Sequence, residues 1–392
     1  MKKKQIDWPS RGHSYTSEEI GILGDFLSSE NTSLSQSNYV IEFEEKFNKQ
    51  FINKSSIALM SAAHAIDLIA LKIRSSTEKR TIICPAHTYC ASALGFLRAG
   101  FNLVFVDIDP EDFTISLDSF YGKVDLKDLA GIIVVHLYGK ASKSSSIIRT
   151  FCDANDVYMV EDCAQALGAT YNDHYVGQLG DFACFSFHSQ KNITTLGEGG
   201  MLVVSSSDEG IFKELRINGH KPFLRENNKP YWLPAMVNTV ETIGGVIPMK
   251  STLSESQALI GSLVLDRYSE LQLKRKELVN TFLSNLECVN YFKFQEGLTD
   301  ESHARHLLPF KVINYDRDKL ISVLFEKYNI KAIVQYYPLN RYHLFKNNSN
   351  VKSLDLENTN DFFDNMISIP FSSTLKKDDM IYMAKSLNEI LC

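Results

Sequence analysis

A single lysine stands between an apolar strand and a glycine-rich return in Phe185-Ser186-Phe187-His188-Ser189-Gln190-Lys191-Asn192-Ile193-Thr194-Thr195-Leu196-Gly197-Glu198-Gly199-Gly200. Apolar residues followed by polar residues and glycine are typical of a buried strand that ends in a loop. Lys191 is then either a solvated loop residue, as most lysines are, or a reactive amine. Its spacing alone does not decide between the two.

Other short β-rich runs surround this stretch and alternate with helical segments. The predicted strands are Ser56–Met60, Thr81–Cys84, Leu103–Asp107, Gly131–His136, Val157–Glu161, Phe182–Phe187 and Met201–Ser205. Strands separated by helix-length segments predict βαβ units and a mostly parallel sheet. The segment Ala62–Ile73 carries apolar residues at helical spacing directly after the first strand. We therefore expect a helix N-terminus at the carboxyl edge of the sheet.

The pattern changes near residue 250. Residues 218–250 have no clear periodicity, whereas Ser254–Leu286 shows a long amphipathic helical pattern. Further strands are expected at Tyr291–Phe294, His306–Ile313 and Ile330–Gln335, with helices at Arg317–Tyr328 and from Lys377. We predict a large α/β domain at residues 1–250, with a mixed, mostly parallel sheet, and a smaller C-terminal α+β domain at residues 251–392.

Composition excludes several classes of protein. The 392 residues carry a net charge of −6, which disfavours nucleic-acid binding, and no apolar run is long enough to span a membrane. We expect a cytoplasmic protein. The seven cysteines are odd in number and form no CxxC pair, and the ten histidines do not lie at ligand spacings beside them. The sequence therefore predicts buried, reduced thiols and no metal site.

A second informative segment is Val160-Glu161-Asp162-Cys163-Ala164-Gln165, in which acidic residues end an apolar strand. Asp162 could cap the following helix. It could instead lie in the ligand crevice at the carboxyl end of the sheet and pair with a protonated ring nitrogen.

Together these motifs resemble the DegT/DnrJ/EryC1/StrS family of sugar aminotransferases, which are pyridoxal 5′-phosphate (PLP) enzymes of fold type I. The resemblance covers nearly the whole chain. The motifs that carry it are Phe105–Pro110, Val135–Gly139, Glu161–Ala169, Ser186–His188 with Lys191 and Gly197–Gly200, and Leu253–Ala258.

This resemblance assigns Lys191 as the catalytic residue. It implies that Lys191 forms a Schiff base with PLP and then moves a proton between the substrate carbon and the cofactor. Asp162 matches the carboxylate that pairs with the pyridine nitrogen. Gln165 matches the residue that hydrogen-bonds the 3′-oxygen, although a glutamine there could also be an exposed helix residue.

The resemblance places the cofactor phosphate at the start of the first helix, on the backbone N–H groups of Ala62 and Ala63. The family usually has Gly and a hydroxyl residue at this turn. Ser186 matches a serine that binds the phosphate, or it is a buried strand serine. Tyr89 matches an aromatic ring that stacks on the pyridine, or it is a core tyrosine.

Two further positions depend on alignment with the family. Lys250 stands where relatives carry an Asn that reaches the phosphate of the neighbouring subunit's cofactor, which implies a homodimer with shared active sites. A surface lysine is the equally plain alternative. His188 either faces the substrate or packs at the strand end, and His136 also lies near the motif positions.

The implied function is transfer of an amino group from an amino acid, L-glutamate by resemblance, to a nucleotide-linked keto sugar. Alternatives are a PLP-dependent sugar dehydratase, an aminotransferase for a non-nucleotide ring ketone, and a regulatory protein that keeps the fold without turnover. Related dehydratases replace the lysine with histidine, so Lys191 favours aminotransfer.

Overall fold

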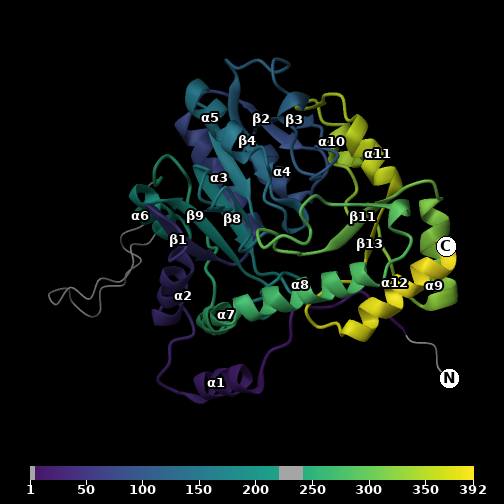
Figure 1. Ribbon diagram of the computed structural model, residues 1–392. Helices are drawn as coiled ribbons and strands as arrows, with labels where there is room; N and C mark the ends of the chain where they lie inside the picture. The colour runs from purple at the N-terminus through teal and green to yellow at the C-terminus, as the bar shows by residue number, and fades with distance from the viewer. Residues whose placement is uncertain (1–4, 220–241) are drawn as a thin grey trace.

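The computed structural model describes residues 5–219 and 242–392, and its centre is an eight-stranded sheet (Figure 1). The strand order is β1-β9-β8-β5-β4-β2-β3-β12. The strands are β1 (Lys54–Leu59), β2 (Thr81–Pro85), β3 (Asn102–Val106), β4 (Leu129–Val135), β5 (Tyr158–Asp162), β8 (Phe182–Ser186), β9 (Gly200–Ser205) and β12 (Val351–Ser353). The first seven coincide with the seven predicted strands to within two residues at each end.

Strand direction explains where a site can form. Strands β8, β5, β4, β2, β3 and β12 run parallel, whereas β9 is antiparallel to both β8 and β1. The sheet is thus mixed and mostly parallel, as predicted. In the register of the three central strands, Asp162 pairs with Val135 on one side and with Cys184 on the other. The end of β5 therefore lies in the middle of the carboxyl edge.

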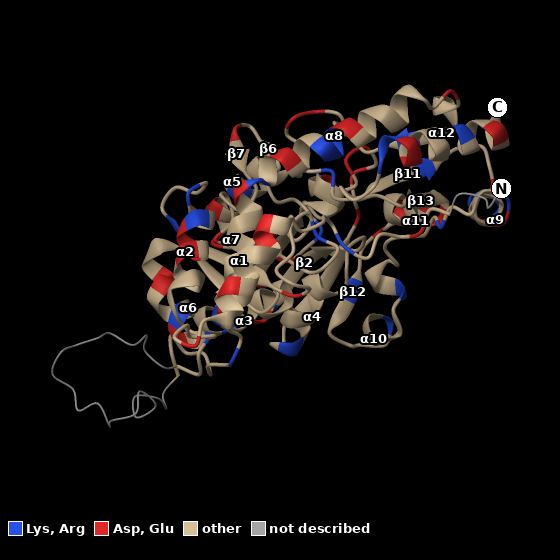
Figure 2. Ribbon diagram, turned by 90° about the horizontal axis from the view of Figure 1, so that it is seen from below, with Lys and Arg blue, Asp and Glu red and all other residues tan. Residues whose placement is uncertain are grey.

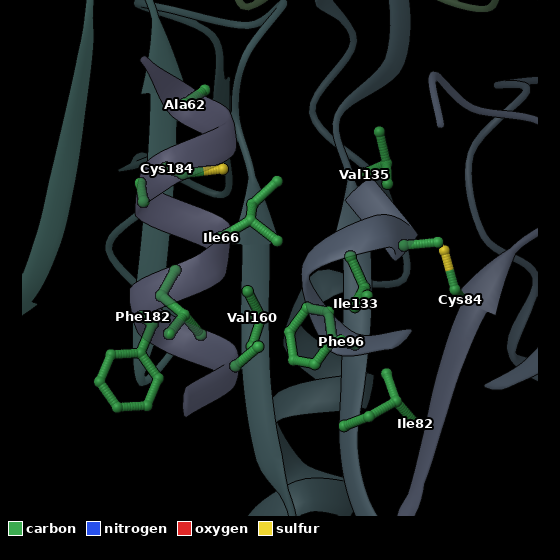
Figure 3. Packing of buried hydrophobic residues seen from close by; sticks show 14 of the residues in the cluster. Ala62, Ile66, Ile82, Cys84, Phe96, Ile133, Val135, Val160, Phe182 and Cys184 are labelled. Atoms are coloured by element: carbon green, nitrogen blue, oxygen red, sulfur yellow. The ribbon is translucent and has the colours of Figure 1, made fainter. Parts of the chain in front are cut away.

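Helices cover both faces of this sheet. They are α2 (Asn38–Asn48), α3 (Ala62–Ser76), α4 (Ala91–Arg98), α5 (Ser145–Asn155) and α6 (Glu209–Leu215), whereas α1 (Ser17–Ser28) packs against a later helix, α7 (Glu255–Asp266). Figure 3 shows Ile66 of α3 and Phe96 of α4 directed at the sheet residues Val160 and Ile133. On the opposite face, Phe47 of α2 lies edge-on to Phe185 of β8, with ring centroids 5.1 Å apart. Apolar side chains thus alternate between two cores.

A smaller antiparallel sheet lies in the C-terminal part of the chain. Its order is β10 (Phe292–Phe294), β11 (Leu308–Val312) and β13 (Met366–Ile369). Helices α8 (Tyr268–Ser284), α9 (Arg317–Tyr328) and α12 (Lys377–Leu391) pack against it around a separate apolar cluster (Figure 1). Helix α9 has the bounds that the sequence predicted, and α12 begins at the predicted residue.

Two sequence predictions in this part were wrong. The long helix expected over Ser254–Leu286 is two helices, α7 (Glu255–Asp266) and α8, separated at Arg267. The Arg267 backbone leaves the helical region, and its guanidinium binds Glu19 near the N-terminus, so a tertiary contact interrupts the pattern. The strand expected at Ile330–Gln335 is absent, because Ile330 bridges Ile6 whereas Ile333 bridges Ser368, and the two partners belong to different segments.

The C-terminal part also contributes to the large sheet. Strand β12 pairs in parallel with β3 at the sheet edge, and the short helix α10 (His343–Lys346) and α11 (Glu357–Asn365) lie near it in Figure 1. The division into domains at residue 250 remains a prediction, and part of the chain beyond it completes the sheet that begins before it.

Charges are mixed over the surface. Figure 2 shows Lys and Arg interspersed with Asp and Glu along the helices that are visible in that view. In the parts of the chain that the structure describes, no helix is both long and apolar enough to cross a membrane.

Candidate active site

Lys191 lies in the loop that follows β8, among the residues that line a pocket. Its backbone N–H donates to the carbonyl of His188 at 2.8 Å, which closes a tight turn at the strand end. Burial lowers the pKa of the amine from 10.5 to about 8, and the nearby Asp162 carboxylate and Cys184 act in the opposite direction. A substantial fraction of Lys191 is therefore a neutral amine near pH 8, which a nucleophile requires.

Asp162 ends β5 and is buried beside the start of α4. One carboxylate oxygen accepts a hydrogen bond from the Ser92 hydroxyl at 2.6 Å, and the other accepts from the Ala164 N–H at 3.0 Å. No helix follows β5, so the helix cap that the sequence allowed is not formed, and the second bond closes a turn instead. Because Asp162 also acts electrostatically on Lys191, the structure brings the two predicted residues into one site.

Gln165 follows Asp162 by one turn and is also buried, so it is not an exposed helix residue. Its carbonyl oxygen accepts from the Tyr138 N–H at 2.8 Å, and its amide donates to the Tyr336 hydroxyl at 2.9 Å. The ring of Tyr336 stacks in parallel on Tyr138, at 6.2 Å between centroids, and lies edge-on to Tyr89 at 5.8 Å. Tyr89 is about half exposed.

Sequence reasoning missed Tyr336, although it lines the same pocket as Lys191. The signal that could have found it is the aromatic pair Tyr336-Tyr337 before Pro338, directly after the segment that was expected to be a strand. Tyr336 connects the C-terminal part of the chain to Gln165 and Tyr89, so both parts build the site.

The start of α3 lies at the same edge. Ser61 is the N-cap, and its hydroxyl accepts from the His64 N–H and contacts the His64 ring. The first-turn N–H groups of Ala62 and Ala63 have no intrahelical acceptors. Gly200 allows β9 to approach this turn, since a Cβ there would lie 2.4 Å from the Ala62 nitrogen. Ser186 pairs with Gly200 in the β8–β9 register, which places it beside the same turn.

The two remaining predicted residues occupy different places. His188 lines the pocket with Lys191, and its Nε2 lies 3.9 Å from a carboxylate oxygen of Glu198. Lys250 is exposed, and its backbone bridges Ile217. Lys250 does not line the pocket of its own chain. Ser35, Ser61 and Glu198 line a neighbouring pocket, which opens beside the start of α3.

One buried group has the geometry of a metal site among the described residues: His136, Glu161 and Cys163. Hydrogen bonds already occupy it. His136 Nε2 contacts Glu161 at 3.0 Å while its Nδ1 accepts from the Ser142 N–H, and Glu161 also accepts from the N–H groups of Gly177 and Gly180. Burial raises the pKa of the Cys163 thiol well above its usual value. The cluster is therefore a satisfied buried network rather than a set of free ligands.

The edge of the sheet fits the cofactor that the resemblance implies. It offers an amine with a lowered pKa at Lys191, a buried carboxylate at Asp162 and an anion-binding helix start at Ala62. These groups match the aldehyde, the ring nitrogen and the phosphate of PLP.

Comparisons with known proteins agree with this geometry. The family model described as the DegT/DnrJ/EryC1/StrS aminotransferase family matches residues 15–388. The GDP-perosamine synthase of Vibrio cholerae is 27% identical over 83% of this chain and 84% of its own. The solved structure of Helicobacter pylori PseC, an aminotransferase involved in the biosynthesis of pseudoaminic acid, superposes with a TM-score of 0.85 at 23% identity, covering 98% of this chain and 99% of that one.

A further solved structure has the same fold with different chemistry. Escherichia coli GDP-4-keto-6-deoxy-D-mannose-3-dehydratase with bound hydrated PLP gives a TM-score of 0.82 at 18% identity, and the match covers 98% of this chain and all of that one. At this identity the likeness establishes the fold alone. The family model matches nearly the whole length of the chain, and this match establishes the family. The chain belongs to the DegT/DnrJ/EryC1/StrS aminotransferase family, as a PLP-dependent aminotransferase.

Proposed function

We propose that this enzyme transfers an amino group from L-glutamate to a nucleotide-linked keto sugar, with Lys191 as the residue that holds PLP. The observation that carries the proposal is the Lys191 amine, whose pKa is lowered to about 8 and which shares a site with the Asp162 carboxylate. The sugar class is supported by relatives such as the GDP-perosamine synthase, and the donor by the resemblance of the motifs.

In this proposal the cofactor is held by residues from several elements. Asp162 binds the ring nitrogen, Gln165 the 3′-oxygen and Tyr89 the ring face. Phosphate binding is assigned to the backbone of Ala62 and Ala63 with the Ser186 hydroxyl. Lys250 is assigned to the neighbouring subunit's cofactor in a homodimer, which agrees with its exposed position, and His188 to the substrate.

The chain's own groups supply the proton chemistry. When bound, PLP supplies an electron-withdrawing ring that stabilises negative charge on the reacting carbon. The buried Asp162 carboxylate keeps the ring nitrogen protonated. Lys191 has a pKa close to neutral pH, so its amine can accept a proton from the substrate carbon and return it, as general acid–base catalysis requires.

The alternative of a dehydratase has one supporting observation, which is the shared fold of the Escherichia coli enzyme. The resemblance argues against it, because the related dehydratases carry histidine in place of Lys191. A ring ketone without a nucleotide remains the alternative acceptor. A regulatory protein without turnover has no need of an amine with a lowered pKa near the buried Asp162 carboxylate.

The deciding experiment is the absorption spectrum of the purified protein with PLP, before and after L-glutamate is added without an acceptor. We expect a band of lysine-bound cofactor that gives way to the band of pyridoxamine phosphate. Lys191→Ala should lack the first band, and a variant of the exposed Lys385, Lys385→Ala, is the control. A bound cofactor that ignores glutamate would refute the donor, and an unchanged band in Lys191→Ala would refute the role of Lys191.

A further inference from the structure

The pocket beside Lys191 is lined by cations and neutral residues only. Its lining comprises Trp8, Pro9, Arg11, His188, Gln190, Lys191, His306, Leu307, Gln335, Tyr336, Phe371 and Ser372. No Asp or Glu is among these residues. Glu198 approaches His188 but is not part of the lining. A partly closed pocket with two basic side chains and no acid favours an anionic ligand.

Arg11 is the side chain in this lining whose charge has no other assigned use. It is exposed, and no described residue forms an ion pair or a hydrogen bond with its guanidinium. Two other arginines near this site already bind protein groups. Arg267 binds Glu19, and the buried Arg275 donates to the carbonyls of Arg305, His306 and Gly12.

Hydrogen bonds hold the backbone next to Arg11 against the loop that follows β8 and carries Lys191. The Gly12 N–H donates to the Ser189 carbonyl at 2.8 Å, and a Cβ on Gly12 would lie 1.7 Å from the Lys191 carbonyl oxygen, so only glycine fits. The Gly12 carbonyl accepts from Arg275 at 2.9 Å and from the Ser373 hydroxyl at 2.8 Å. On the other side, Gln190 donates to the Pro9 carbonyl at 3.1 Å.

These bonds bring four separate parts of the chain together at one residue: the N-terminal segment, the loop after β8 that carries Lys191, helix α8 and the segment after β13. The backbone that carries Arg11 therefore cannot drift from Lys191 without breaking several buried hydrogen bonds. A site whose supporting backbone is fixed in this way loses little entropy when it binds a ligand.

We infer that Arg11 binds the α-carboxylate of the amino donor. This inference rests on the proposed function and names the residue that recognises the donor in the same site. The α-carboxylate is one bond away from the carbon that bears the amino group, so a donor whose amine reaches the cofactor on Lys191 carries its carboxylate into this pocket. A guanidinium presents two parallel N–H donors that match the two oxygens of a carboxylate.

The neighbouring residues suit the rest of such a ligand. Gln190 and the Ser372 hydroxyl supply neutral polar groups, whereas Trp8 and Phe371 supply apolar walls that exclude water. Exclusion of water strengthens a charge-assisted hydrogen bond. The diphosphate of a nucleotide sugar is the other anion that could use Arg11, and the two half-reactions distinguish the two sources.

The test uses the PLP-loaded enzyme in stopped-flow measurements of the donor half-reaction without acceptor. Arg11→Gln should raise the apparent Kd for L-glutamate by roughly 10- to 100-fold, the usual effect of a lost charge-assisted hydrogen bond. Arg11→Lys should recover part of the affinity, because it restores the charge without the planar fork. The cofactor band should stay unchanged in both variants.

A donor that lacks the α-carboxylate sharpens the test. Wild-type enzyme should react far more weakly with 4-aminobutyrate than with L-glutamate, and Arg11→Gln should lose most of that preference. The control variant is Arg74→Gln, which removes a positive charge in the last turn of α3, roughly 20 Å from the first residue of that helix. The control should match the wild type.

Three results would overturn the inference. One is an unchanged Kd for L-glutamate in Arg11→Gln. Another is an unchanged preference for L-glutamate over 4-aminobutyrate. The third is a defect confined to the sugar half-reaction, which would assign Arg11 to the acceptor's phosphate. If the wild-type enzyme binds PLP but reacts with no amino acid, the proposed function fails first, and that outcome is separate from these three.

Discussion

Two buried carboxylates stand side by side at the end of β5 and face opposite sides of the sheet. Glu161 points to the side of α5, where it contacts His136 and accepts from the backbone of Gly177 and Gly180. Asp162 points to the side of α3 and α4, where it accepts from the Ser92 hydroxyl, the Ala164 N–H and the Cys184 thiol and raises the pKa of Lys191. A single step along a strand therefore separates an acid held in a hydrogen-bonded network from the acid that we propose to bind the cofactor.

The difference lies in which groups surround each carboxylate: an imidazole and two backbone N–H groups bind Glu161, whereas Asp162 lies near the Lys191 amine. Burial raises the pKa of Glu161, but the hydrogen bonds from His136 and from the two glycine N–H groups outweigh it and the net pKa is lowered. Since His136 Nδ1 accepts from Ser142, the proton of a neutral imidazole is on Nε2 and is donated to Glu161. Asp162 accepts as many hydrogen bonds, one of them the weak bond from the Cys184 thiol, but it lies close enough to the Lys191 amine to raise its pKa, and a carboxylate in that place is suited to bind a protonated ring nitrogen.

The largest effect should come from removing the functional charge. Asp162→Asn keeps the shape of the side chain and can still accept from Ser92, so the protein should fold, but it cannot keep the cofactor ring protonated. We expect turnover to fall by roughly 100-fold or more, the usual cost of losing one preorganised electrostatic group. Steady-state kinetics with saturating PLP would measure this loss. Turnover within threefold of the wild type would contradict the assignment.

The adjacent substitution should act on stability instead. Glu161→Gln removes the charge that His136 and two N–H groups bind, and it leaves buried donors poorly paired. We expect a loss of about 3 kcal/mol in the free energy of unfolding, measured by urea denaturation followed by circular dichroism. The folded protein that remains should bind PLP normally. The comparison fails if Glu161→Gln unfolds like the wild type but loses turnover as Asp162→Asn does.

The same acid makes stability depend on pH. Because the folded pKa of Glu161 lies below its unfolded value, the stability that Glu161 contributes is present above about pH 4.5 and is lost as the pH falls through the folded pKa. The Glu161→Gln variant should therefore lose less stability between pH 5 and pH 3 than the wild type does.

The sequence predicted much of this arrangement because strand periodicity and strand ends are local features. The seven strands from β1 to β9 in the large sheet, the start of α3 and the bounds of α9 follow from residues that are close together in the chain. Lys191 and Gln165 were predicted from the resemblance of their motifs to the family, and Asp162 also from its place at a strand end, since parallel strand ends meet at one edge.

Contacts between distant segments could not be predicted in this way. The interruption at Arg267 depends on Glu19, and the place of Tyr336 depends on Gln165, a residue 171 positions earlier. Gly12 lies 179 positions before Lys191, and no local pattern indicates that a glycine is required there. Strand β12 was not predicted either, because its partner β3 lies far away in the sequence.

The smallest expected effect is a change in the pH dependence of cofactor attachment, and it sharpens the comparison of the two acids. Only the neutral amine of Lys191 attacks the PLP aldehyde, so the rate should rise about tenfold per pH unit below pH 8 and level off above it, since the pKa of Lys191 is about 8. An ordinary lysine would level off only near pH 10.5.

The Asp162 carboxylate raises the pKa of Lys191, so Asp162→Asn should move the bend to lower pH. Glu161→Gln should leave the bend in place, because Glu161 is not among the groups that act on this amine. Stopped-flow absorption of the PLP-free protein mixed with PLP between pH 6 and pH 10 would measure all three bends. An equal shift in both variants would show that the two carboxylates act on Lys191 alike, and the distinction between them would have to be abandoned.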